Sequence, residues 1–311
     1  MPDRIVASIS FEESTPPPGT TFETEGARYL KISAIDGRAN HALLCSSSSG
    51  PDGPLLISVH GSGGSAFRGL NDHLAQHLPA AGCSVLAIDT RQAGKGVNRD
   101  NFFAVRRDIE AAFATARFLG FERIVLHGHS LGNIQALYFA ATTWSPALKG
   151  VVLTSMFANL PWKSRNILPP GGDTYDAWQA EARAAARNAE FPALIEPMKN
   201  PAGPLAARMS AEHFLTYRDM EASAAVGTDW IRRVPAPILL IRHEGDTLVS
   251  SAEADSMLAA ATALGALTDD ASLKTITSAS GANGFAAHDF IDDADRRAVT
   301  DHIGDWIKRR L

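Results

Sequence analysis

The sequence contains only two cysteines, Cys45 and Cys83, and both lie in or beside apolar, strand-like runs. Two such residues make neither a disulfide framework nor a cysteine metal site, so we expect two buried thiols in a reducing compartment. The chain also lacks an apolar run long enough to span a bilayer. Residues Met1 to Val6 show no apolar signal segment. We therefore expect a cytoplasmic protein with no membrane span.

An excess of positive charge is also missing. The 311 residues include 29 Lys and Arg against 34 Asp and Glu, a formal net charge of −5. Without a basic field, nucleic acid is not an expected partner. The hydrophobic content of 45% and charged content of 20% are typical of a globular chain. The length fits one large domain with an insertion, and a homodimer is left open.

Short apolar runs alternate along the chain with segments of helical periodicity. After an irregular arm over residues 1–27, an Asp36-Gly37 turn between residues 29–34 and 40–45 predicts an antiparallel hairpin. Nearly continuous apolar strands follow, which predicts a mostly parallel sheet with helices on both faces. The expected strands of this sheet are residues 55–59, 85–88, 124–127, 151–153, 238–241 and 273–277.

The alternation of strands and helices breaks between Met156 and Arg233. This segment carries Pro-Gly breaks near residues 169–172 and 200–204, and between them residues 174–189 are alanine-rich. We interpret residues 156–233 as an inserted helical cap, with the core formed by residues 1–155 and 234–311. Its methionines and tryptophans predict a plastic pocket, although packing of the cap onto the core explains each of them equally well. The pocket residues expected here are Met156, Phe157, Trp162 and Met209.

The most informative motif is Gly128-His129-Ser130-Leu131-Gly132, which ends an apolar run and precedes a helical segment. Glycines on both sides of a serine suit a sharp strand-to-helix turn that exposes the serine hydroxyl as a nucleophile. By this motif and its surroundings, the chain resembles the α/β-hydrolase superfamily over nearly its whole length. The resemblance implies a mostly parallel central sheet flanked by helices, with an inserted helical cap.

The resemblance also implies that Ser130 is followed along the chain by an acid and then a histidine. His213, His243, His288 and His302 are the histidines far enough beyond Ser130. His213 falls in the cap, His243 abuts a strand end, and His302 lies in a C-terminal amphipathic helix. His288 follows the last strand in a glycine-containing loop, where the family carries its catalytic base.

The acid of the family lies just past the penultimate strand. Here Glu244-Gly245-Asp246 follows that strand, and Asp246 stands in the family's acid position. The sequence departs from the family pattern at His243, where a glycine is usual, which leaves Glu244 as the alternative acid. Asp289 is too close to His288 in sequence to orient its imidazole.

An oxyanion hole needs two backbone donors. The motif supplies the Leu131 N–H, and the family's His-Gly loop, here His60 to Ser65, suggests Ser62 as the second donor with Gly63 as the alternative. The same glycine cluster lacks the spacing of a phosphate-binding loop.

No metal or cofactor is expected, because His127 and His129 lack an evident third ligand. The sequence therefore predicts a serine hydrolase of small to medium carboxylic esters, with a small-molecule ester as its partner. A lactone, thioester or carbon–carbon bond hydrolase with the same triad is the alternative. A third possibility is a non-catalytic binding scaffold, but the presence of all three triad residues argues against it.

Overall fold

A nine-stranded sheet forms the centre of the computed structural model, which describes residues 9–20, 22, 24, 26–94, 98–168, 171–190, 194–195, 209–278 and 281–311. The strand order is β1-β2-β3-β5-β4-β6-β7-β10-β11. Strands from β5 to β11 in this order run parallel, while β1, β2 and β3 are antiparallel to their neighbours. The strands are β1 (Ser10–Glu13), β2 (Arg28–Ser33), β3 (Ala39–Cys45), β4 (Leu55–Val59), β5 (Ser84–Ile88), β6 (Ile124–His129), β7 (Leu148–Thr154), β10 (Ile238–His243) and β11 (Ala271–Ile276).

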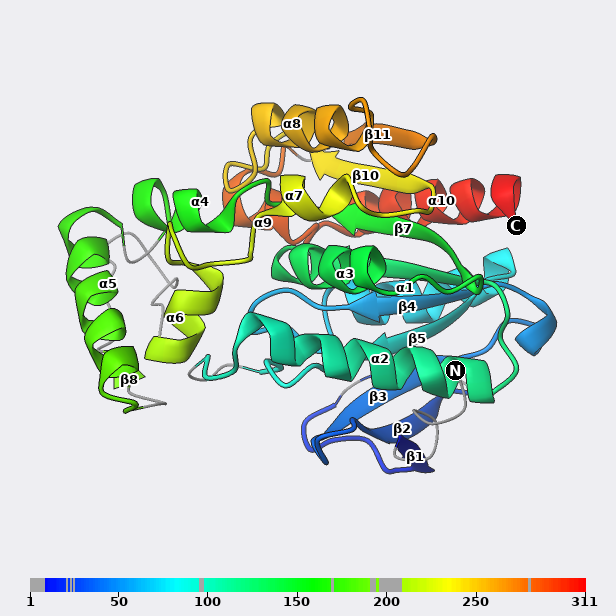
Figure 1. The fold of residues 1–311 in the computed structure, drawn as a ribbon. Coiled ribbons are helices and arrows are strands. Elements are labelled where there is room, and N and C mark those ends of the chain that lie inside the picture. Colours follow the sequence, from blue (N-terminus) through cyan, green and yellow to red (C-terminus); the bar gives the residue numbers. More distant parts are fainter. Residues whose placement is uncertain are drawn as a thin grey trace.

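Both faces of the sheet are buried under helices, as the continuous apolar strands predict. Because successive strand residues point to opposite faces, Val125 packs on one side of β6 and Leu126 on the other. The Val125 side is covered by α1 (Leu70–His77) and α10 (Asp293–Arg310). The Leu126 side is covered by α2 (Phe102–Phe118), α3 (Leu131–Thr142), α7 (Gly227–Ile231) and α8 (Ser251–Ala261) (Figure 1). This three-layer arrangement is the predicted α/β-hydrolase fold.

Local sequence signals set several element ends. The Asn101 side chain accepts a hydrogen bond from Ala104 N and caps α2. Ser250 and Glu253 form a capping box at the start of α8. The 3₁₀ helix η1 (Gly50–Asp52) precedes β4, and the 3₁₀ helix η2 (Leu78–Ala81) follows α1. No described helix is long and apolar enough to cross a membrane.

The N-terminal arm differs from the prediction, because it contains strand β1 within residues that were expected to be irregular. Strand β1 pairs antiparallel with β2, placing Phe11 opposite Ile32. The Phe11 ring also meets Phe118 of α2 edge-on at 5.6 Å. Charged residues hid this strand from the sequence pattern, yet Glu13 forms an ion pair with Arg28 across the ladder. An edge strand with one face in water tolerates such charges.

The segment between β7 and β10 includes residues 156–233, which were predicted to form a cap. Residues at both of its ends, such as Met156 and Ile231, lie in the main core cluster. The part that stands apart holds α4 (Leu160–Asn166), α5 (Gly172–Arg187) and α6 (Ala211–Tyr217), beside a small ladder of β8 (Leu194–Ile195) and β9 (Met209–Ser210) (Figure 1). A separate apolar cluster of Tyr175, Trp178, Met209 and Phe214 joins α5 to α6. The breaks at residues 169–170 and 200–204 lie outside the described residues.

Lys163 joins α4 to the segment that follows β10. Its side chain is only 1% exposed, and its Nζ donates to Leu248 O and to a carboxylate oxygen of Glu253. The same ammonium lies 5.0 Å from the centre of the Phe157 ring. A buried charge is stable only when it is paired in this way, so Lys163 fixes α4 against the segment that follows β10.

We expect Lys163→Met to lower the free energy of unfolding by about 1–3 kcal/mol, because it leaves buried acceptors without a donor. Urea unfolding measures this loss. Arg165→Met is the matched control: its ion pair with Asp176 is 44% and 53% exposed, so its loss should cost less than about 1 kcal/mol. Equal effects of the two substitutions would contradict the tethering role of Lys163.

Candidate active site

Ser130 occupies a strained turn between the end of β6 and the start of α3. Its backbone has φ 53° and ψ −120°, a conformation that a non-glycine residue rarely adopts. A Cβ on Gly128 would lie 2.5 Å from Gly132 O, and one on Gly132 would lie 2.6 Å from Val59 O. Ser130 N donates to Thr154 O of β7 at 3.0 Å. The glycines are therefore required by the close approach of three backbone segments, which hold the serine in place.

The structure brings Ser130, His288 and Asp246 into one hydrogen-bonded row. His288 Nε2 lies 2.8 Å from Ser130 Oγ, and His288 Nδ1 lies 2.9 Å from Asp246 Oδ2. Because an ionised carboxylate only accepts, Nδ1 carries the proton and the free Nε2 accepts from the serine hydroxyl. The three residues are 8%, 2% and 4% exposed. Shielded from water, these contacts are stronger than the same contacts at a surface.

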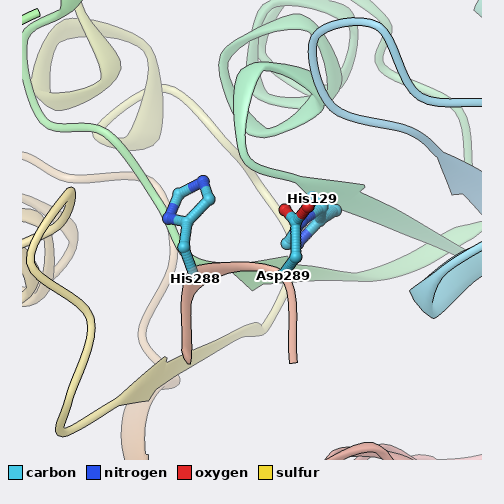
Figure 2. A group of neighbouring side chains, drawn as sticks. All are labelled: His129, His288 and Asp289. Carbon is cyan, nitrogen blue, oxygen red and sulfur yellow. The ribbon is translucent and has the colours of Figure 1, made fainter. Parts of the chain in front are cut away.

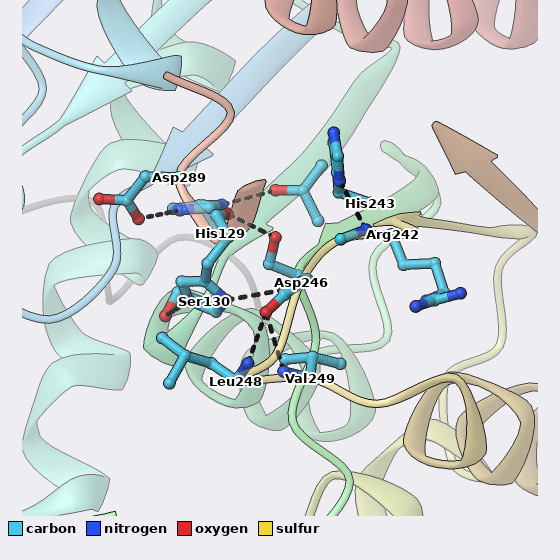
Figure 3. A network of polar contacts seen from close by, with 12 residues as sticks. His129, Ser130, Arg242, His243, Asp246, Leu248, Val249 and Asp289 are labelled. Atoms are coloured by element: carbon cyan, nitrogen blue, oxygen red, sulfur yellow. Dashed lines mark hydrogen bonds and ion pairs between the residues drawn. The ribbon is translucent and has the colours of Figure 1, made fainter. Parts of the chain in front are cut away.

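Asp246 is held in a tight turn after β10. Its Oδ1 accepts from Leu248 N at 2.8 Å and from Val249 N at 2.9 Å, which leaves Oδ2 for His288 (Figure 3). Glu244, the alternative acid, is exposed. His243 is fully buried: its Nδ1 accepts from Gly245 N at 2.9 Å, and its Nε2 lies 3.2 Å from Asp295 Oδ2. The histidine that departs from the family pattern thus braces the turn that carries the acid.

The loop that carries His288 packs directly on this turn. Gly284 N, at the start of α9 (Gly284–His288), donates to Gly245 O at 2.8 Å. A Cβ on Gly245 would lie 2.2 Å from Ala282 O. Ser155, which follows β7 with φ 52°, donates its hydroxyl to His288 O at 2.7 Å. Sequence reasoning missed Ser155, although its place just after a central strand marks it as a residue at the active edge of the sheet.

The His60 to Ser65 loop lies against Ser130, as an oxyanion loop would. A Cβ on Gly61 would lie 2.9 Å from Ser130 Cβ, and Gly64 N donates to Gly61 O across a turn centred on Ser62 and Gly63. His60 braces this turn: Nε2 accepts from Thr90 N at 3.0 Å, so Nδ1 is the nitrogen that donates to Gly61 O at 2.7 Å. Burial lowers the pKa of His60, which favours this neutral form.

The two histidines before Ser130 differ in their partners. His127 is buried, with Nδ1 2.8 Å from Ser58 Oγ and Nε2 3.0 Å from Thr154 Oγ1. Burial lowers the pKa of His127 to about 3, so it stays neutral. His129 Nε2 lies 3.2 Å from Asp289 Oδ1.

His129, His288 and Asp289 offer one potential metal-ligand atom each within 4.8 Å of one another (Figure 2). This group contains His129 but not His127, so it differs from the His127 and His129 pair considered from the sequence. A metal ion bound by all three residues would have to take a ring nitrogen of His288, and in this structure those nitrogens contact Asp246 and Ser130.

The four predicted pocket residues have different surroundings in the structure. The Phe157 ring lies 5.7 Å from the His288 ring, and Met156 is buried in the main core. Trp162, on α4, is 46% exposed. Met209 belongs to the separate apolar cluster of the cap. Of the four, Phe157 is the one whose contact with the site is direct.

Comparison with known proteins places the chain in a family. The model of the alpha/beta hydrolase family matches residues 56–299, and the chain belongs to this family. An uncharacterized protein, YfhR, of Escherichia coli strain K12 is 23% identical over 173 residues, which cover 54% of this chain and 61% of that protein. The chain therefore matches less than two thirds of the length of this relative.

Solved structures share the fold over nearly the whole chain. Est1E from Butyrivibrio proteoclasticus has a TM-score of 0.65 at 17% identity and covers 92% of this chain and 99% of its own. A hypothetical protein from Pseudomonas aeruginosa, PA2218, has a TM-score of 0.70 at 19% identity, covering 96% and 99%. A monoacylglycerol lipase from Paleococcus ferrophilus has a TM-score of 0.62 at 18% identity, covering 88% and 99%. At sequence identities this low, the similarity to these structures establishes a shared fold and no shared function.

We expect Gly245→Ala to force the turn after β10 away from the His288 loop and to lower the free energy of unfolding by about 1–3 kcal/mol. Reaction of Ser130 with an organophosphonate should slow in parallel, because Asp246 moves. Gly304→Ala is the control: its Cβ would meet Ala81 and Leu78 at an ordinary 3.6 Å, so stability should hold or rise. Normal stability and normal labelling of Gly245→Ala would show that the two loops are not interlocked as described.

Proposed function

We propose that the protein is a serine hydrolase that cleaves small to medium carboxylic esters through an acyl-enzyme on Ser130. The observation that carries this proposal is the row of Ser130, His288 and Asp246, joined by contacts of 2.8 and 2.9 Å. A neutral imidazole that accepts from a serine hydroxyl and donates to a fixed carboxylate is the arrangement that activates serine for attack on a carbonyl.

In the first half of the reaction, His288 Nε2 takes the proton of Ser130 as Oγ forms a bond to the carbonyl carbon. Asp246 stabilises the imidazolium that forms. The carbonyl electrons move onto the oxygen, where the N–H groups of Leu131 and Ser62 donate, with Gly63 as the alternative to Ser62. Leu131 begins α3, so its N–H lies outside the ladder of helix hydrogen bonds and at the positive end of the helix dipole.

The tetrahedral species then collapses. The carbon–oxygen bond of the leaving alcohol breaks as His288 returns its proton to that oxygen. Water enters, gives a proton to His288 and attacks the acyl carbon, and a second collapse releases the acid and restores the Ser130 hydroxyl. Every proton passes through Nε2, so the position of this one atom controls both halves of the cycle.

The structural neighbours support ester cleavage over the other chemistries of this scaffold, because they include a monoacylglycerol lipase and an esterase from Pyrococcus furiosus. Lactone, thioester and carbon–carbon bond hydrolysis would use the same triad. Initial rates on p-nitrophenyl esters of graded chain length, alongside lactones and thioesters, rank these substrates. A strong preference for any class other than carboxylic esters would correct the substrate but leave the nucleophile unchanged.

We expect Ser130→Ala to abolish turnover and organophosphonate labelling without a change in stability, because one buried hydroxyl is lost. Residual activity above about a hundredth of wild type would place the nucleophile elsewhere. His288→Ala should lose as much activity, and the double variant should be little worse than either single one. Losses that multiply would mean that the two residues do not act as a unit. A wild-type protein that neither labels nor hydrolyses any ester would support a binding scaffold.

For the acid, we expect Asp246→Asn to reduce kcat/KM by about 10²–10⁴-fold, because an amide at this position favours the wrong tautomer of His288. Glu244→Gln serves as the control and should stay within about threefold of wild type, since Glu244 is exposed. The reverse ranking in steady-state kinetics would move the acid to Glu244.

A further inference from the structure

A second acid–imidazole pair lies directly beside the candidate triad. His129 immediately precedes Ser130, and Asp289 immediately follows His288. His129 Nε2 and Asp289 Oδ1 are 3.2 Å apart (Figure 3). The His129 ring lies 5.7 Å from the His288 ring. The contact between His129 and Asp289 therefore links the residue before Ser130 to the residue after His288.

The orientation of His129 is fixed from the interior of the sheet. Its Nδ1 lies 3.0 Å from Thr154 Oγ1, and Thr154 is fully buried in β7. Because the Asp289 carboxylate only accepts, His129 Nε2 is the donor in this contact. The Thr154 hydroxyl also lies 3.0 Å from His127 Nε2, so it bridges the two imidazoles. Asp289, His129 and Thr154 thus repeat the order of carboxylate, imidazole and hydroxyl found in the triad. Thr154 has no access to solvent, so this second row is not a second nucleophilic site.

The Asp289 carboxylate places a negative charge beside the base. Burial raises the pKa of Asp289, but the hydrogen bond from His129 and the electrostatic effect of the nearby His129, His288 and Arg296 side chains outweigh it and lower the pKa overall. These three groups come from β6, α9 and α10. The Asp289 side chain is 37% exposed, so solvent weakens the effect of its charge on His288 without removing it.

We propose that His129 and Asp289 form a positioning pair that ties the His288 loop to the nucleophile turn and keeps a second carboxylate beside the imidazolium. This inference rests on the proposed function. Two consequences follow from it. Breaking the contact lets His288 Nε2 drift from Ser130 Oγ, and removing the charge makes the protonated form of the base less favourable in the reaction.

The test compares Asp289→Ala, Asp289→Asn and His129→Ala by steady-state kinetics on p-nitrophenyl acetate and by the rate of organophosphonate labelling. We expect Asp289→Ala and His129→Ala to lower kcat by about 10–100-fold with KM within about threefold, because the base is displaced and the substrate site is kept. The double variant should be no worse than the single ones. Asp289→Asn keeps the size and an acceptor oxygen, so its loss should be only about 3–10-fold.

The pH profile separates positioning of the base from general stability. Only the neutral base is active, and a nearby carboxylate favours its protonated form. Loss of that charge in Asp289→Asn should therefore move the acid limb of kcat/KM to lower pH. Asp293→Asn removes an equal charge from a side chain that is 77% exposed and should leave both rate and profile unchanged.

Wild-type labelling rates and an unmoved acid limb in Asp289→Asn and His129→Ala would overturn this inference, while the loss of labelling in Ser130→Ala would still support the proposed function. If Ser130→Ala keeps its activity, the function itself fails and the positioning pair fails with it. Should Asp289→Ala not fold, Asp289→Asn carries the comparison by itself.

Discussion

The backbone conformation of Ser130 is the constraint on which the site depends. A residue held at φ 53° costs about 1–3 kcal/mol and persists only where its surroundings leave no alternative. Here a strand end, a helix start and the His60 to Ser65 loop approach so closely that Gly61, Gly128 and Gly132 have no room for a Cβ. The bond from Ser130 N to Thr154 O adds the neighbouring strand. Ser130, the proposed nucleophile, is thus positioned by the sheet itself.

The groups around Ser130 are interlocked with one another as well as with the sheet. The turn that carries Asp246 contacts the His288 loop through Gly245, and its Leu248 carbonyl accepts from Lys163 of the cap. A displacement of any one of these segments is passed to the others, because buried, close-packed contacts have little room to relax. Helix α4 is therefore coupled, through Lys163, to the turn that carries Asp246.

Much of the fold and the turn around Ser130 could be predicted, because their signals are local, whereas Asp246 and His288 followed from the family resemblance. The glycines around Ser130, the capping box at Ser250 and the apolar strand runs each act within a few residues of the chain. The contacts that were missed join distant residues. Neither the burial of Lys163 nor the pairing of His129 with Asp289 leaves a local pattern, since each depends on the topology that brings two loops together.

The acyl-enzyme is the central claim, and intact-protein mass spectrometry after rapid acid quench tests it most directly. With p-nitrophenyl acetate, the account predicts a transient gain of one acetyl group that maps to the peptide containing Ser130. The adduct should accumulate further in Asp246→Asn, if deacylation slows more than acylation, and should be absent in Ser130→Ala. Turnover with no adduct under any quench, or an adduct on another residue, would contradict the account.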